Sequence, residues 1–410
     1  MPVFLVATLD TKGEEASFVA ARLAEAGVDV AIVDAGCLGE PRGQAQVPRE
    51  MVFAAAGTSL QEVRQRGDRG AAVGAAARGV AAIVLREFQA GRVDGVLAIG
   101  GGAGTTIGTA AMRALPIGVP KVMVSTLASG EVSHFVGSKD VLMLNSVVDL
   151  AGINRISRVV LTRAAQAMAG MLRGGAVASA SDRPLVAASM FGVTTPCVQA
   201  ARAVLEAAGY EVLVFHATGS GGKTLESLAA DGLLAGVLDV TTTELADELV
   251  GGVLSAGKQR LTAAGRQGVP QVVSVGALDM VNFHGQATVP ARFGGRTLYA
   301  HNEHVTLMRT SAGECRELGR EIGRKLAGAR GPAEIVFPGR GISAYDAPSG
   351  PFHDPAARAE LLKGLEETRA AVPLHHLDLH INDAAFARFV AQRLLTLMGA
   401  PAPDPTNNLP

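Results

Sequence analysis

The hydrophobic pattern begins with a short apolar strand, an amphipathic helix and a second strand. The strand patterns are "VFLVATLD" at residues 3–10 and "VDVAIVDAG" at residues 28–36, and the residues between them have helical spacing. The same three patterns return over residues 185–219, as "LVAASMFG", "VTTPCVQAARAVLEAAG" and "YEVLVFHATG". Two later strands also recur in order, since "DGVLAIGGG" resembles "AGVLDVTTT" and "GVPKVMVST" resembles "GVPQVVSVG". The chain therefore contains an internal repeat.

Continuous apolar strands that alternate with helices predict parallel sheets covered on both faces. We expect an α/β fold of two doubly wound, Rossmann-like domains at residues 1–178 and 184–400, with a cleft between them. The small and polar residues of 173–184 mark the junction. Ligands of such sheets bind beyond the carboxyl ends of the strands, so the residues that follow each strand are the candidates for function.

Composition narrows the classes of partner. The chain has 37 basic and 38 acidic residues among 410, so its net charge is close to zero. It therefore has no overall positive potential that would attract nucleic acid or an anionic membrane. Its apolar stretches are shorter than the roughly 20 residues of a spanning helix, and the amino terminus lacks the features of a signal peptide. We expect a cytoplasmic protein. The three cysteines have no metal-type spacing and are expected to be reduced, with Cys197 a buried structural thiol rather than an activated one.

In the first half, two stretches follow strands and suit a phosphate group. "DTKG" caps a helix and adds a mobile charge, while "GGGAGTT" lets the backbone approach an anion closely. Each stretch alone is also compatible with an ordinary helix cap or a tight turn. Dinucleotide-binding motifs have an acidic residue about 20 positions after the glycine turn, where it bonds the ribose. The first half has no such residue, so a mononucleotide is favoured over NAD. The candidate residues are Asp10, Thr11, Lys12, Arg69, Gly101, Gly102, Ala103, Gly104 and Thr105.

In the second half, polar residues at strand ends outnumber those that helix caps require, including the stretch "TTTE" at residues 241–244. They are expected to converge on a small polar ligand, in one crevice that faces the first domain. The candidates are His216, Lys223, Asp279, Asn282, His301, Glu303, Arg340, Asp346 and Asp383. His301 and His304 with Asp279 or Asp383 are an alternative metal set, but a lone H-x-x-H does not specify a metal and none is expected.

The stretch "HATGSGGKT", residues 216–224, partly matches a P-loop. It has the second glycine and the lysine, but Ala217 stands where the first glycine belongs. We expect Lys223 to meet an anionic ligand of the second domain rather than a nucleotide. No G-x-S-x-G motif is present to anchor a hydrolase triad.

These stretches together resemble the Tm-1-like ATP-binding family, which contains uncharacterised bacterial proteins and the N-terminal region of a plant protein that inhibits tobamovirus RNA replication. The resemblance covers nearly the whole chain and includes "DTKG", "GGGAGTT", "MFGVTTPCV", "FHATGSGGK", "GALDMVNF", "HNEHVTLMRT" and "HINDAAFA". It implies two Rossmann-like domains, a homodimer, and ATP, with or without Mg²⁺, on the first-half candidates. Some relatives carry a further C-terminal domain resembling a phosphoenolpyruvate hydrolase, so a separately encoded partner of that kind is also implied.

Two functions remain open from the sequence. In the first, the protein binds ATP and its second domain or the interdomain cleft binds a small anionic metabolite, with or without ATP-dependent chemistry. In the second, it is a non-catalytic regulatory module whose ATP-stabilised dimer recognises another protein. The sequence does not decide whether the protein is an enzyme, because it contains no recognisable catalytic base.

Overall fold

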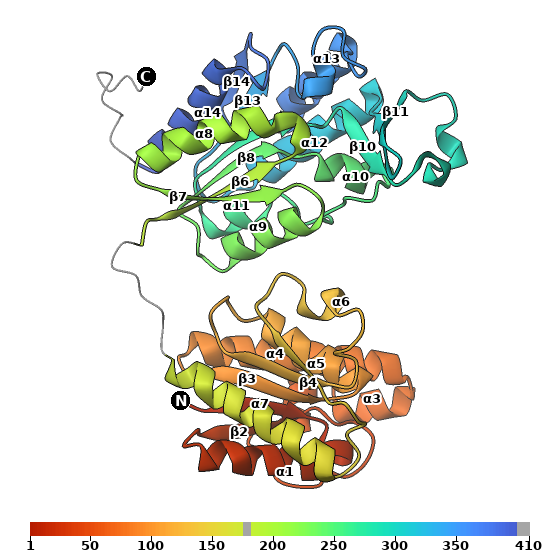
Figure 1. Ribbon diagram of the computed structural model, residues 1–410, viewed down its shortest axis with the longest axis vertical. Helices are drawn as coiled ribbons and strands as arrows, with labels where there is room; N and C mark the ends of the chain where they lie inside the picture. Colours follow the sequence, from red (N-terminus) through yellow and green to blue (C-terminus); the bar gives the residue numbers. More distant parts are fainter. Residues whose placement is uncertain (175–181, 400–410) are drawn as a thin grey trace. The chain divides into compact units, whose positions relative to one another are not determined.

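The computed structural model describes residues 1–174 and 182–399. The chain divides into two compact units, Met1–Ser179 and Ala180–Pro410, and each has its own α/β core (Figure 1). The predicted junction at residues 173–184 lies mostly outside the described residues, as does residue 400, where the second domain was expected to end. No helix of the described ranges is long and apolar enough to cross a membrane.

The first unit is a five-stranded parallel sheet in the order β2-β1-β3-β4-β5. Its strands are β1 (Val3–Ala7), β2 (Val30–Asp34), β3 (Gly95–Gly100), β4 (Lys121–Ser125) and β5 (Leu142–Asn145). Its helices are α1 (Leu9–Glu25), α2 (Arg49–Ala55), α3 (Leu60–Arg66), α4 (Arg69–Gln89), α5 (Gly102–Arg113), α6 (Ser133–Val136) and α7 (Arg155–Arg173).

Alternate side chains of each buried strand enter cores on opposite faces of this sheet. Leu5 packs with apolar residues of α1 and α7, whereas Phe4 and Val6 pack with those of α2, α4 and α5. The helices accordingly lie on both faces of the sheet (Figure 1). This arrangement explains why the strands are apolar throughout rather than alternating with polar residues.

The second unit contains a six-stranded parallel sheet in the order β14-β13-β9-β8-β6-β7. Its strands are β6 (Leu185–Met190), β7 (Glu211–His216), β8 (Gly236–Thr241), β9 (Gln271–Gly276), β13 (Ala333–Pro338) and β14 (Leu374–Leu377). Its helices are α8 (Thr195–Ala207), α9 (Ser220–Ala230), α10 (Glu244–Val250), α11 (Ala263–Gln267), α12 (Ala312–Ala327), α13 (Pro355–Thr368) and α14 (Ala384–Leu397). One face carries α8 and α14, and the other carries α9 to α13 (Figure 1).

The strands of the repeat take equivalent places in the two sheets. The order β2-β1-β3-β4 of the first unit corresponds to β7-β6-β8-β9 of the second, strand for strand. The predicted fold class, two doubly wound parallel sheets built on an internal repeat, is confirmed.

A separate antiparallel sheet interrupts the second unit and was not predicted from the sequence. Its strands are β10 (Met280–Phe283), β11 (Leu298–Asn302) and β12 (Val305–Arg309), in the order β10-β12-β11. The stretch "HNEH" therefore lies on a hairpin between β11 and β12, and does not follow a strand of the parallel sheet. The rule that places ligands beyond the carboxyl ends of parallel strands does not apply to it.

Candidate functional site

The crevice between β1 and β3 is the expected ligand position in the first unit. These strands are neighbours, yet the helices that follow them, α1 and α5, pack on opposite faces of the sheet. Such a reversal opens a crevice beyond the strand ends. A small cavity of about 80 Å³ lies here, lined by Thr8, Asp10, Thr11, Ala35, Cys37, Leu38, Arg69, Ala72, Val73, Ala76, Ala103 and Ile107.

The cavity brings together residues that are far apart in the sequence. Asp10 and Thr11 come from the start of α1, Arg69 from the start of α4, and Ala103 from the start of α5. All four are sequence candidates. The volume is below the roughly 300–1,000 Å³ of ligand pockets, so it suits one portion of a ligand whose remainder lies on the open strand ends.

Asp10 has a structural role that the sequence did not reveal. Its Oδ2 accepts hydrogen bonds from the backbone N–H groups of Leu38 at 2.8 Å and Gly39 at 3.2 Å. Asp34 acts similarly, because its Oδ1 accepts from Leu9 at 3.0 Å and from Gly36 at 2.9 Å. Burial raises the pKa of Asp34. The Asp10 carboxylate therefore holds the loop that lines the cavity, and its contact with a nucleotide stays a prediction.

The glycines of the "GGGAGTT" turn fall into two groups. A Cβ at Gly100 would lie 2.7 Å from Gly104 Cα, and one at Gly104 would lie 3.0 Å from Ile99 O, so both positions are closed by backbone. At Gly101 and Gly102 the nearest atoms are Thr126 Oγ1 at 3.6 Å and Leu127 Cδ1 at 3.8 Å, which are ordinary contacts. Neither of these two glycines has a positive φ. The fold itself therefore does not require glycine at positions 101 and 102.

Thr105 is a sequence candidate for the nucleotide site, but its hydroxyl is hydrogen-bonded within the first domain. It is buried, its Oγ1 donates to Gly101 O at 2.8 Å, and the same hydroxyl pairs with Ser125 Oγ at 2.6 Å. The side chain thus faces the sheet, because the i−4 carbonyl and β4 both offer it partners. Thr106, one position on, is more accessible and donates to Gly102 O.

Two cations lie at the starts of the helices that border this crevice. Lys12 interrupts α1 with a non-helical conformation, φ −126° and ψ 23°. Arg69 is the first residue of α4 and is exposed. Within residues 1–174 and 182–399, neither side chain has a hydrogen-bond or ion-pair partner. Thr11 is also exposed, and its hydroxyl pairs with that of Thr8 at 2.8 Å.

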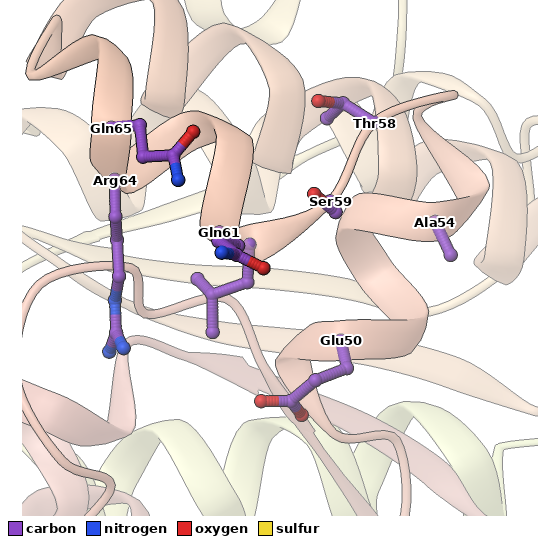
Figure 2. Close-up of a pocket in the computed structure, with 8 residues that line it drawn as sticks. Glu50, Ala54, Thr58, Ser59, Gln61, Arg64 and Gln65 are labelled. Atoms are coloured by element: carbon purple, nitrogen blue, oxygen red, sulfur yellow. The ribbon is translucent and has the colours of Figure 1, made fainter.

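A larger groove of about 630 Å³ lies elsewhere on the first unit, between α2 and α3 (Figure 2). Its lining contains none of the sequence candidates and consists of Glu50, Ala54, Thr58, Ser59, Leu60, Gln61, Arg64 and Gln65. Arg64 Nε donates to Cys37 O at 3.0 Å, so the groove is tied to the loop of the smaller cavity. Size alone does not make this groove the functional site, because its lining comes from α2, α3 and the residues between them rather than from the strand ends.

In the second unit, the "HATGSGGKT" loop is closed by a carboxylate of the protein itself. Glu244 Oε1 accepts hydrogen bonds from Gly219 N at 2.7 Å and Gly222 N at 3.0 Å. In a P-loop such N–H groups surround phosphate. Lys223 and His216, both sequence candidates, are exposed at this loop and do not contact Glu244. Glu244 therefore occupies the N–H groups of Gly219 and Gly222, which in a P-loop would bind phosphate.

Glu244 belongs to a buried network around Arg260. Arg260 is fully buried, its Nε donates to Glu244 Oε2 at 2.6 Å, and its Nη2 donates to Asp239 Oδ1 at 2.7 Å. Asp239 also accepts from Ser189 Oγ at 2.6 Å. Sequence reasoning missed Arg260, because it lies in a loop with no recognisable motif. The network links β6, β8 and α10, and Glu244 connects it to the loop at residues 216–224.

Asp279, a sequence candidate, lies in a second buried polar cluster with Ser343 and Arg309. Ser343 Oγ donates to Asp279 Oδ2 at 2.6 Å, while Oδ1 has no partner. Burial raises the pKa of Asp279 to about 7, and Arg309 is the group that most opposes this rise. Asn282, another candidate, donates from Nδ2 to Asp247 Oδ2 at 2.8 Å. Burial likewise raises the pKa of Asp247 to about 7.

The other candidates of the second unit are paired with neighbouring groups of the protein. Asp346 is buried and paired with Arg358 at 2.7 Å, and Asp383 Oδ2 accepts from His380 N at 2.8 Å. Arg340 is exposed and paired with Asp378 at 2.6 Å. These three are satisfied by neighbours that the sequence did not identify.

His301 and Glu303 correct an expectation directly. His301 was expected to converge with Asp279 on one ligand, but Asp279 is buried, whereas His301 is exposed on edge strand β11 and its Nδ1 pairs with Tyr345 OH at 3.0 Å. Glu303 lies in the hairpin turn, and it pairs with His304 at 3.1 Å with both side chains 83% exposed. Among the described residues no three His, Cys, Asp or Glu side chains are grouped to hold a metal, so the alternative metal set of His301, His304 and an aspartate is not assembled.

Burial raises the pKa of the Cys197 thiol to about 12, as expected for an unreactive structural thiol.

The fold defines a two-domain α/β protein with a glycine-rich turn after β3 in its first domain. The N-terminal domain of the uncharacterised protein family UPF0261 matches residues 1–176, and the C-terminal domain of that family matches residues 183–398. The chain belongs to the UPF0261 family.

Relatives extend over nearly the whole chain. A UPF0261 protein of Clostridium tetani is 44% identical over 97% of this chain and 98% of its own length. A UPF0261 protein of Mesorhizobium japonicum is 47% identical over 95% of this chain and 97% of its own length. The tomato ToMV resistance protein Tm-1 is 44% identical over 74% of this chain but 41% of its own length. The resemblance to Tm-1-like proteins is confirmed. Among solved structures, a UDP-N-acetylglucosamine 2-epimerase aligns over 99% of both chains with a TM-score of 0.23 and 11% identity.

Proposed function

We propose that this protein binds ATP at the β1/β3 crevice of its first domain. The phosphates lie over Gly101 and Gly102 at the start of α5, where free N–H groups and the helix dipole favour an anion. Lys12 and Arg69 supply the balancing charge, and the cavity beside Thr8 and Cys37 takes the rest of the nucleotide.

The observation that carries the proposal is the open pair of glycines. Neither packing nor backbone conformation requires glycine at Gly101 or Gly102, and a side chain there would cover the N–H groups of the helix start. Close approach of a ligand is the remaining physical reason for these residues. The resemblance to the Tm-1-like ATP-binding family supports ATP among phosphate ligands.

For the second domain we propose a small anionic metabolite, bound beyond the carboxyl end of β9. Support comes from Arg309, which is 6% exposed and has an unpartnered Nη2. A buried guanidinium donor without a partner costs free energy that an anionic oxygen would recover. Lys223, at the edge of the same sheet, is exposed and does not define this site.

A regulatory module rather than an ATPase is the second candidate function. Asp10 and Asp34 are the carboxylates closest in sequence to the β1 and β2 ends, and both accept backbone hydrogen bonds from the surrounding loops. A carboxylate committed in this way is poorly placed to activate water. ATP would then stabilise one arrangement, such as a homodimer, instead of being consumed.

Isothermal titration with Mg²⁺-ATP and with sodium triphosphate tests the proposal. The wild-type protein should bind ATP, and Lys12→Met and Arg69→Met should each weaken binding at least about tenfold through loss of a phosphate contact. Lys223→Met is the matched control, because it removes an exposed lysine from the second domain. Equal weakening by the control variant, or unchanged binding in both test variants, would place the nucleotide elsewhere.

A further inference from the structure

Asp279 and Arg309 each retain one buried polar atom without a partner. Asp279 is fully buried and uses Oδ2 for Ser343, leaving Oδ1 free. Arg309 donates from Nε to Phe352 O at 2.9 Å and from Nη1 to Thr310 Oγ1 at 2.8 Å, leaving Nη2 free. One free atom is an acceptor and the other is a donor. Native proteins rarely leave such atoms unsatisfied without an unseen water or a functional reason.

The two side chains belong to one cluster but do not form an ion pair. Thr310 joins them, because its N–H donates to Asp279 O at 3.2 Å and its hydroxyl accepts from Arg309. Arg309 and Asp279 are not within ion-pair distance, although their charges interact. The other charges of the cluster, Asp346 and Arg358, pair with each other at 2.7 Å. The Asp279 and Arg309 charges therefore remain available to a bridging molecule.

The backbone beside Asp279 is held in an uncommon conformation. Ala277 is buried and has φ of 56°, in the left-handed region that disfavours a residue with a Cβ. Its N–H donates to Ile342 O at 2.9 Å, and Thr310 Oγ1 donates to Leu278 O at 2.8 Å. The surrounding structure thus fixes the loop that positions Asp279. Strain of this kind is concentrated at ligand sites.

An aromatic cluster links this buried pair to the surface. The rings of Tyr299 and Tyr345 lie 4.9 Å apart, and Phe352 lies 6.3 Å from Tyr299 and 6.1 Å from Tyr345. Phe352 also supplies the carbonyl that holds Arg309, while Tyr299 and His301 are exposed. The chain has three tyrosines and no tryptophan, so two of its three tyrosines gather here.

We propose that this cluster binds a hydroxylated carboxylic acid of the sugar-acid class. The ligand carboxylate accepts from Arg309 Nη2, an adjacent hydroxyl donates to Asp279 Oδ1, and the C–H face of the carbon chain packs on Tyr299. Because the pair is buried, binding requires displacement of the Tyr345–Phe352 segment. The inference rests on the proposed anionic ligand of the second domain and specifies its chemical class.

Three six-carbon probes separate the parts of this inference. D-gluconate carries both groups, hexanoate lacks hydroxyls, and D-glucose lacks the carboxylate. By isothermal titration of the full chain, gluconate should bind about tenfold or more tightly than the other two, because a site built to bond a hydroxyl rejects the analogue without it. Equal binding of hexanoate would overturn the hydroxy-acid class and leave the anion proposal standing. Binding of none of the three would assign the free atoms to buried water and overturn the inference.

Variants locate the site. Asp279→Asn keeps an acceptor for Ser343, and Arg309→Met keeps most of the buried volume; each should reduce gluconate affinity at least about tenfold. Tyr299→Ala, at a side chain that is partly exposed, should weaken gluconate binding too, and circular dichroism checks that the variant is folded. Arg340→Met is the control. Gluconate affinity unchanged in Tyr299→Ala and in a folded Asp279→Asn protein would overturn the site. ATP titration of the same samples reports the first domain separately.

Discussion

Gly222 donates a backbone hydrogen bond to the carboxylate of Glu244, with 3.0 Å between N and Oε1. A Cβ at Gly222 would lie 2.1 Å from Glu244 Oε2, so the position must be glycine for the carboxylate to fit. The start of α9 thus receives an anion, as helix N-termini do, but the anion is part of the chain. The glycines of "GSGG" are explained without a nucleotide, in contrast to Gly101 and Gly102.

Gly102→Val should abolish or strongly weaken ATP binding while leaving the thermal stability of the protein nearly unchanged. The nearest atom to a new Cβ is Leu127 Cδ1 at 3.8 Å, so the fold accommodates the side chain, whereas a phosphate over the helix start does not. Isothermal titration gives the affinity and circular dichroism the melting temperature. Lys223→Ala should retain ATP affinity, and the reverse order of the two variants would contradict the assignment.

Purified protein should bind Mg²⁺-ATP yet release little phosphate. Asp10 is committed to Leu38 and Gly39, so it cannot readily serve as a base. The measurement is colorimetric phosphate release at saturating ATP, compared with a protein-free sample. Rapid release by wild-type protein that is lost in Gly102→Val would show that the first domain is an ATPase.

Arg260→Met should destabilise the protein by about 3–5 kcal/mol, the usual cost of removing one partner from a buried ion pair. Asp239 and Glu244 would be left as buried carboxylates without their cation. Urea unfolding followed by circular dichroism measures the loss. Arg340→Met is the matched control, because its pair with Asp378 is exposed and should leave the midpoint unchanged. Similar midpoints for both variants would mean that the buried network contributes little.

Asp247 should make stability depend on pH. Its pKa is raised by burial from 3.8 to about 7, so the native state holds this proton to higher pH than the unfolded chain does. The resulting stabilisation is complete below about pH 4 and is lost as pH rises through about 7. Urea unfolding at pH 5 and pH 8 should show a smaller decrease for Asp247→Asn than for wild type.

The Asp247→Asn variant is expected to fold, because the neighbouring amide can adapt. Asn282 Nδ2 donates to Asp247 and its Oδ1 has no partner, so rotation of the amide would offer Oδ1 to the new NH₂ group. Asp378→Asn, at an exposed carboxylate, is the control. An identical pH dependence in wild type and Asp247→Asn would show that this carboxyl does not titrate as proposed.

The sequence by itself determined the repeat, both parallel sheets and the family. Apolar runs of strand length followed by helical spacing leave little choice but β-α-β crossovers, because each strand must be covered on both faces. The glycine turn and Lys12 also follow from local pattern, since their position after a strand places them at a sheet edge. These features depend on neighbours in sequence.

Only the tertiary structure decided what each polar group contacts. The partners of Gly222, Asp10 and Asp279 are Glu244, the Leu38–Gly39 loop and Ser343, all brought near by the fold rather than by the local sequence. The sequence also did not predict the hairpin that exposes His301, because a short apolar run fits a parallel or an antiparallel strand equally well. A polar residue at a strand end predicts a position, but its partner depends on elements distant in sequence.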